Sequence, residues 1–298
     1  MKKIHNILAV AAIALTFTAC SSDNDTPADS GKEYPISLSV GISDLSVVTR
    51  AENTTTLTDG ELGLYITKNG EKNVLGKYLC NNAQFTYNNG WSCGTTYYWA
   101  ADNATIDYVA YHPYQSSISG NFISWDVTNQ SSGNLDLLYE NATGVANNDN
   151  HSIAITLGHV CSKLVVNVSK LGSEIASGTT ISSIKIGGLK PKGTFNLIDG
   201  TWDSSNETAA DIEMAVLVTP NQGMKATCEA ILIPQTAPFT LTIRLSDNSE
   251  YQLTVPSHTF EAGTCYSLTI QVGQDNVTLG SITQTDWVTQ DGGDLTAQ

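Results

Sequence analysis

The sequence contains few charged side chains, and positive charge is the scarcest kind. Of 298 residues 14% are charged, and 14 Lys and Arg stand against 29 Asp and Glu, which gives a formal net charge of −15. Nucleic-acid binding needs a basic face that displaces counterions from phosphates, so this composition excludes nucleic acid as a partner. The same charge disfavours binding to an anionic membrane surface.

Motifs with catalytic or metal-binding spacing are also missing. Beyond the N-terminal segment, no histidine forms an HxH or HExxH pattern. CxxC, GxSxG, phosphate-loop and dinucleotide-binding glycine motifs do not occur in the sequence either. We therefore predict no enzyme, no metal site and no cofactor.

Five cysteines follow the N-terminal segment: Cys80, Cys93, Cys161, Cys228 and Cys265. An odd number excludes complete pairing in disulfides. Cys80 and Cys93 flank a predicted turn and are placed to form a disulfide, whereas all five also suit small buried apolar positions. Cys161 follows His159 by two residues, so a strand would put a nucleophile and a base on one face. Packing in a strand or hairpin is the favoured interpretation of this pair.

The first 20 residues have the composition of a signal peptide. Lys2 and Lys3 precede an apolar run, residues 7–19, that is too short to span a bilayer. The run ends in Phe17-Thr18-Ala19-Cys20, which resembles a bacterial lipobox whose cysteine thiol is acylated. We predict that lipid on Cys20 anchors the chain in the outer membrane. The polar residues after Cys20 predict a flexible tether.

Period-two alternation of apolar side chains dominates the remaining sequence and predicts an all-β fold. The first such run carries Ile36, Leu38, Val40 and Ile42 on one face. The cleanest hairpin spans 239–255, with a turn at 247–250. Further strands are predicted at residues 62–67, 97–99, 106–111, 122–127, 135–139, 153–160, 163–168, 181–186, 194–198, 214–218, 226–233, 266–272 and 277–282.

About 15 strands are more than the seven to nine of a single β-sandwich, so we predict two sandwiches in tandem. The polar, turn-rich stretch 141–150 places the boundary nearby. The predicted organisation is a signal peptide at 1–20, a tether plus removable first strand at 21–50, and sandwiches at 51–152 and 153–298. A strand starting near residue 153 fits either sandwich.

Aromatic residues are concentrated in the first half: Trp91, Tyr97, Tyr98, Trp99, Tyr108, Tyr111 and Tyr114. Exposed rings would make a platform for sugar faces, which stack on aromatic side chains. Burial in a sandwich core is the favoured interpretation, because Trp99, Tyr108 and Tyr111 fall within predicted strands.

A series of short motifs resembles the fimbrillin family of Bacteroidota. In order, these motifs are Thr49-Arg50-Ala51, Gly63-Leu64-Tyr65, Tyr98-Trp99, Asp107-Tyr108-Val109-Ala110-Tyr111-His112-Pro113-Tyr114, Asp136-Leu137-Leu138-Tyr139, Leu157-Gly158-His159, Gly193-Thr194-Phe195, Leu232-Ile233-Pro234-Gln235 and Phe260-Glu261-Ala262-Gly263. Each motif is short, but together they extend over essentially the whole chain after the signal peptide.

This resemblance implies two tandem transthyretin-like β-sandwiches in a structural or adhesive subunit of a cell-surface fimbrium, exported as a lipoprotein. The implied partners are other fimbrial subunits and, through Cys20, the outer membrane. Fimbrillins are matured by an arginine-specific cut, and the resemblance places that cut between Arg50 and Ala51.

The arginine count agrees with a single cleavage position. The other arginine, Arg244, lies inside a predicted strand, where ladder pairing denies a protease the extended backbone it needs. Cleavage after Arg50, in a predicted exposed loop, would remove the strand at 36–42 and leave an apolar groove with unpaired edges. A strand from another subunit would fill that groove.

Two alternatives to a repeating stalk subunit are also predicted. Residues 288–298 are polar apart from Val288 and Leu295, so they are a poor donor strand and favour a tip, anchor or accessory position. The alternative function is a non-polymerising surface lipoprotein that binds host or dietary glycans through the aromatic cluster.

Overall fold

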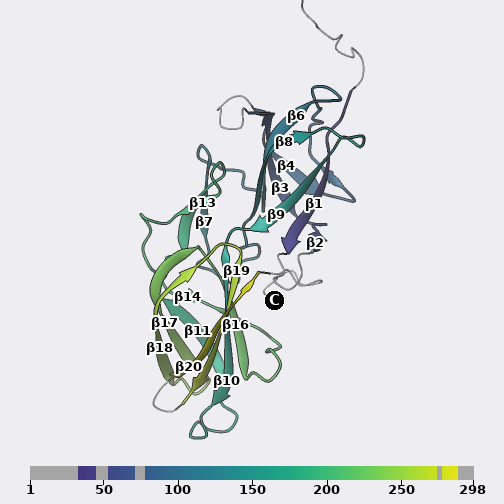
Figure 1. The fold of residues 1–298 in the computed structure, drawn as a ribbon. Helices are drawn as coiled ribbons and strands as arrows, with labels where there is room; N and C mark the ends of the chain where they lie inside the picture. Colours follow the sequence, from purple (N-terminus) through teal and green to yellow (C-terminus); the bar gives the residue numbers. More distant parts are fainter. Residues whose placement is uncertain (1–32, 45–52, 71–77, 274–276, 288–298) are drawn as a thin grey trace, which may run out of the picture. The chain divides into compact units, whose positions relative to one another are not determined.

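The computed structural model describes residues 33–44, 53–70, 78–273 and 277–287, all within the compact unit Glu33–Gln298. Every regular element assigned in these ranges is a β-strand, so the all-β prediction is confirmed (Figure 1). Within the same ranges, no helix is long and apolar enough to cross a membrane.

Eight strands form the first sheet, in the order β2-β1-β9-β8-β6-β3-β4-β5. Their bounds are β1 Ser37–Asp44, β2 Asn53–Thr56, β3 Glu61–Lys68, β4 Tyr78–Tyr87, β5 Trp91–Ser92, β6 Thr105–His112, β8 Leu138–Ala146 and β9 Ser152–His159. β1 and β9 pair in parallel, whereas the other neighbours in this sheet pair antiparallel.

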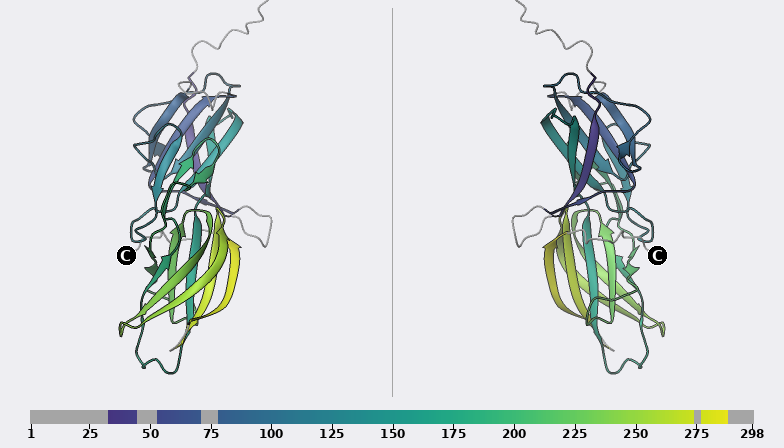
Figure 2. Two further views of the ribbon diagram at one scale, coloured as in Figure 1. Left: turned by 90° about the vertical axis from the view of Figure 1, so that its left-hand side faces the viewer. Right: turned by 90° about the vertical axis from the view of Figure 1, so that its right-hand side faces the viewer.

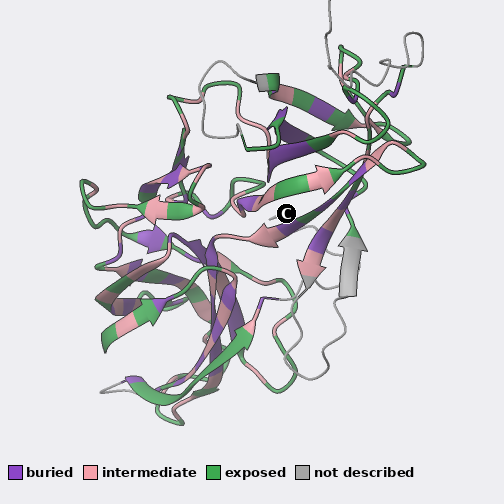
Figure 3. Ribbon diagram, turned by 45° about the horizontal axis from the view of Figure 1, so that its top comes forward, coloured by how far each residue is buried: buried purple, intermediate pink, exposed green. Residues whose placement is uncertain are grey.

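The alternation along these strands divides their side chains between two apolar cores. Leu64 and Ile66 of β3 and Tyr108 of β6 belong to the core that the first sheet encloses. Val109 and Tyr111, the residues of opposite parity on β6, belong to a different core on the outer face. Buried residues, purple in Figure 3, accordingly follow the strands.

Two further sheets enclose the largest core of the second half. The five-stranded sheet has the order β15-β16-β10-β19-β20 and the four-stranded sheet has the order β14-β11-β17-β18. Their bounds are β10 Ser162–Leu171, β11 Ile181–Gly187, β14 Ile212–Glu213, β15 Ala215–Val216, β16 Ala226–Leu232, β17 Gln235–Leu245, β18 Glu250–Phe260, β19 Thr264–Val272 and β20 Val277–Asp286. Apolar side chains from both sheets meet in one cluster, which makes this part of the fold a β-sandwich.

A three-stranded sheet, β13-β12-β7, contributes to the third core. Its strands are β7 Phe122–Asp126, β12 Lys192–Asn196 and β13 Thr201–Asp203. Phe195 of this sheet packs in one cluster with Tyr111 of β6, Ile231 of β16 and Trp287. This third core therefore joins side chains from early and late parts of the chain.

The predicted division into two tandem domains at residue 153 stays a prediction. β9 begins at Ser152 and pairs with β1 and β8, so it belongs to the sheet of first-half strands. β7, which precedes residue 153, pairs with β12, which follows it. Strands from both sides of this position thus share a sheet.

Several strands differ from those predicted. Residues 97–99 form no strand, and Tyr98 makes only an isolated bridge with Pro35. β4 was not predicted, because Asn82 has a φ of 46° at a register shift that breaks the period-two pattern. β8 starts later than predicted and runs into the polar stretch 141–150. Its polar side chains serve as hydrogen-bond partners, since Asn141 Nδ2 donates to the Ile198 carbonyl at 2.8 Å.

Candidate functional site

The first strand of the described residues, β1, lies between two others. β1 pairs in parallel with β9 from Ser37↔Ser152 to Ile42↔Leu157, and antiparallel with β2 from Gly41↔Thr56 to Asp44↔Asn53. Figures 1 and 2 show β1 (purple) beside β9 (teal). Residues 53–56, for which an exposed loop was predicted, are therefore a strand that covers one edge of β1.

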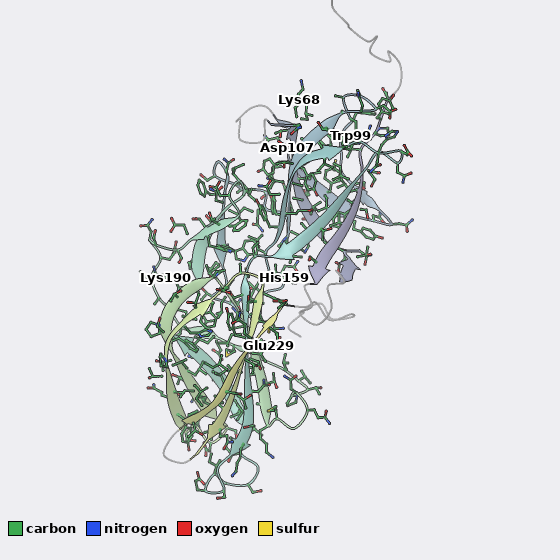
Figure 4. All side chains as sticks on the ribbon, in the orientation of Figure 1. Lys68, Trp99, Asp107, His159, Lys190 and Glu229 are labelled. Carbon is green, nitrogen blue, oxygen red and sulfur yellow. The ribbon has the colours of Figure 1, made fainter. Side chains whose placement is uncertain are left out.

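The segment that precedes β1 is also attached, to Tyr97, Trp99 and His151 outside the strands of the sheet. Ile36 N donates to the Tyr97 carbonyl and Trp99 N donates to the Tyr34 carbonyl, both at 2.8 Å. The Tyr34 and His151 rings meet edge to face, with centroids 4.9 Å apart. Figure 4 labels Trp99 in this part of the molecule. The N-terminal segment is thus held from Tyr34 to Asp44.

The four side chains predicted to share the core face of the first strand all pack in the core of the first sheet. Val40 and Ile42 are 2% and 8% exposed, and Ile36 and Leu38 are partly buried against the same cluster. Tyr34 belongs to this cluster too. Sequence analysis missed Tyr34, although it continues the alternation by one more step.

The predicted modification positions Cys20, Arg50 and Ala51 lie outside the described residues. Arg50 and Ala51 nevertheless have a described strand on each side, because β1 ends at Asp44 and β2 begins at Asn53. The connection between two paired strands, residues 45–52, therefore contains both Arg50 and Ala51.

The candidate nucleophile and base, Cys161 and His159, are not arranged for catalysis. They do not share one strand, since β9 ends at His159 and β10 begins at Ser162. His159 Nδ1 lies 2.6 Å from Asp136 Oδ2, and its ring stacks on Trp287 with centroids 4.4 Å apart (His159 is labelled in Figure 4). The Cys161 thiol contacts the Leu135 carbonyl at 3.8 Å. These contacts indicate packing in the third core.

All five described cysteines are free thiols, so the Cys80–Cys93 disulfide is not formed. Burial raises the pKa of the Cys80 and Cys228 thiols to about 12. Burial also raises the pKa of Cys161 and Cys265 above its ordinary value. These four thiols are therefore protonated at neutral pH, whereas a nucleophilic cysteine needs its thiolate.

The aromatic cluster of the first half is mainly internal. Trp99, Tyr108 and Tyr111 are 3%, 2% and 0% exposed, as expected for residues of core strands. Tyr98 is 44% exposed. Three of the rings that a glycan platform would need are thus unavailable for stacking on a ligand.

No group of three or more His, Cys, Asp or Glu side chains is placed to hold a metal ion in the ranges that the structure describes. The candidate functional site is therefore the seat of β1. This seat is formed by β9, β2 and residues 97–99.

Comparison with known proteins finds relatives of similar length. The chain is 26% identical over 310 residues to Fim1C, a proposed fimbrium subunit of Bacteroides uniformis, and the match covers 98% of both chains. A crystal structure of a proposed cell adhesion protein from Bacteroides ovatus has a TM-score of 0.69 at 18% identity, and covers 87% of this chain and 100% of that one. A second, from Bacteroides uniformis, has a TM-score of 0.65 at 22% identity, and covers 86% and 100%.

The two solved structures share the fold of this chain. Residues 49–287 match the fimbrillin-like family, which is more than half of the sequence and includes all strands from β2 to β20. The chain belongs to the fimbrillin-like family.

Proposed function

We propose that this chain is a structural or adhesive subunit of a cell-surface fimbrium, exported as an outer-membrane lipoprotein and assembled by strand exchange after cleavage at Arg50. Its proposed partners are other fimbrial subunits and, through lipid on Cys20, the outer membrane. The proposed role involves no catalysis.

The position of β1 relative to Arg50 carries this proposal. Arg50 lies in the connection between β1 and β2, and both flanking strands are paired with each other. A cut after Arg50 leaves β2 on the mature chain and frees β1 from any covalent link to it. Only non-covalent contacts then hold residues 33–44 in place.

Loss of β1 would uncover both backbone and apolar groups. The carbonyl of Tyr97 and the N–H groups of Trp99 and Leu57 would lose the partners that they have in the first segment. Fully burying one Val or Ile side chain stabilises a fold by roughly 1.5–3 kcal/mol, so the empty sites of Val40 and Ile42 favour a new occupant. An extended strand from another subunit supplies both kinds of contact.

The lipid is tested by Cys20→Ala in the native host. Because acylation requires the thiol, the variant should incorporate less than about a tenth of the wild-type amount of a labelled fatty acid, and should leave the membrane fraction. Cys93→Ala is the matched control, since Cys93 is a partly exposed thiol in the mature chain. Labelling of the Cys20→Ala chain at the wild-type level would exclude lipidation at this residue.

The N-terminus of the protein extracted from the cell surface tests the proposed assembly. Mass spectrometry of wild-type protein from sheared surface fibres should identify Ala51 as the first residue. Surface protein that keeps an acylated Cys20 and occurs in no fibre would contradict assembly by strand exchange. That result would favour the non-polymerising lipoprotein instead.

A further inference from the structure

The first sheet has a gap between β8 and β9. These strands pair only at Leu138↔His159 and Tyr139↔Gly158 within the described residues. The preceding part of β9, residues 152–157, pairs with β1 along its other edge. On the edge that faces β8, the backbone of these residues forms hydrogen bonds with side chains.

Three side chains bind the backbone of β9 on this side: Asn148 from the turn that precedes β9, Glu140 from β8 and Tyr108 from β6. Asn148 Nδ2 donates to the Ser152 carbonyl at 2.8 Å, and Ser152 N donates to Asn148 Oδ1 at 3.1 Å. Thr156 N donates to Glu140 Oε2 at 2.6 Å. The Tyr108 hydroxyl donates to Glu140 Oε2 at 2.7 Å and lies 3.1 Å from the Ala154 carbonyl oxygen, a second acceptor for the same proton.

The residues bound in this way alternate along β9. An extended strand directs the backbone groups of alternate residues to opposite edges, so Ser152, Ala154 and Thr156 all present theirs on the side away from β1. Asn148, Tyr108 and Glu140 therefore form a side-chain ladder that substitutes for a neighbouring strand.

Tyr108 is the buried member of the side-chain ladder, whereas the hydrogen bonds of Asn148 are exposed. Tyr108 is 2% exposed and packs in the core of the first sheet. Burial raises the pKa of the Glu140 carboxyl, and the hydrogen bonds from Tyr108 and Thr156 partly oppose this effect. When Glu140 is ionised, the hydrogen bonds that it accepts are about twice as strong as neutral ones.

We propose that the side-chain ladder holds β9 extended as the acceptor strand while the seat of β1 is empty. The inference rests on the proposed function. Once β1 leaves, residues 152–157 lose their backbone partners on one edge, and among the described residues the side-chain ladder supplies those on the other. Packing of Ile153 and Ile155 in the core continues, but it does not satisfy N–H and C=O groups.

Asn148, Tyr108 and Glu140 are thus positioning residues for strand exchange. An acceptor edge that is already extended captures an incoming strand without first ordering its own backbone, which reduces the entropic cost of binding. Without the side-chain ladder, an empty seat would let β9 open locally before a new strand arrives.

The first test measures amide exchange in the uncut chain, for the peptide that covers residues 152–157. Glu140→Leu removes the acceptor of Thr156 N–H and should accelerate exchange of this amide at least tenfold. Glu140→Gln keeps a side-chain oxygen acceptor and should stay within threefold of wild type. Unchanged exchange in Glu140→Leu overturns the side-chain ladder.

The second test measures strand capture in an Arg244→Lys background, where Arg50 is the only arginine. The chain is cut with an arginine-specific protease, the N-terminal fragment is removed, and the remaining chain is mixed with a fluorescent peptide that has the sequence of residues 33–44. Fluorescence anisotropy then gives the rate of capture. Tyr108→Phe and Glu140→Leu should capture the peptide at least tenfold more slowly than the chain with neither substitution, and Glu140→Gln should rescue the rate.

Tyr111→Phe is the matched control for Tyr108→Phe. It removes a buried hydroxyl from the same strand, but that hydroxyl donates to Asn82 Oδ1 at 2.6 Å, away from β9. Wild-type capture by Tyr111→Phe supports the inference. Faster amide exchange with normal capture in Glu140→Leu would overturn the inference and leave strand exchange intact. Cut chains that capture no peptide, wild type included, would overturn strand exchange and the inference with it.

Discussion

Arg50→Lys is expected to stop maturation, so that mature protein beginning at Ala51 falls at least tenfold on the cell surface. The substitution keeps the positive charge and removes the side chain that an arginine-specific protease recognises. The other arginine cannot replace it, because Arg244 pairs with Ser183 of β11 and with Glu250 of β18. A protease needs an extended, unpaired backbone, which a central strand does not offer.

The control for this experiment is Arg244→Lys, which should mature and assemble as wild type does. Arg244 Nη2 donates only to Asn248 Oδ1 at an exposed turn in the described structure, so the change should alter stability by less than about 0.5 kcal/mol. Electron microscopy of fibres and N-terminal mass spectrometry compare the two variants. Fibres at wild-type levels in Arg50→Lys, with an N-terminus other than Ala51 in wild type, would falsify cleavage at Arg50.

Local patterns in the sequence were sufficient to predict much of the fold. The hairpin at 239–255 is present as β17 and β18, because its apolar residues alternate regularly and Asp247-Asn248-Ser249-Glu250 provides the turn. Asn248 adopts a φ of 70°, which asparagine tolerates better than most residues. All-β architecture follows from many such local signals.

Pairings between distant segments could not be predicted in the same way. The parallel pairing of β1 with β9 depends on where the chain returns after several strands, and no local pattern encodes this. β2 consists of Asn53 and three threonines, whose polarity suggested a loop. Threonine is β-branched and therefore suited to a strand as well, and pairing with β1 decides between loop and strand.

The apolar side chains of the candidate site were predicted from the sequence, whereas its polar side chains were not. Ile36, Leu38, Val40 and Ile42 follow a periodic pattern, so their common face could be inferred directly. Asn148, Tyr108 and Glu140 come from different segments, and only the folded chain brings them to β9. Single polar residues without a fixed spacing leave no signal that a sequence can be searched for.

A charge in the core face of β1 should have a much larger effect than the same charge on its opposite face. Val40 is 2% exposed in the core of the first sheet, whereas Ser39 is exposed on the same strand. Val40→Asp would bury a carboxylate among apolar side chains without a partner. We expect a loss of stability on the order of 3–5 kcal/mol, a large part of the 5–15 kcal/mol that stabilises a typical protein.

Ser39→Asp places the same carboxylate in water and should cost less than about 0.5 kcal/mol. Urea unfolding of the uncut Val40→Asp and Ser39→Asp chains measures the difference directly. A peptide of residues 33–44 that carries Val40→Asp should also fail to enter the empty seat, since the incoming strand must fill the same apolar site. Equal unfolding free energies for the two variants would mean that β1 contributes little to the core. In that case its removal would leave no groove for a second strand to fill, and cleavage at Arg50 could not drive assembly.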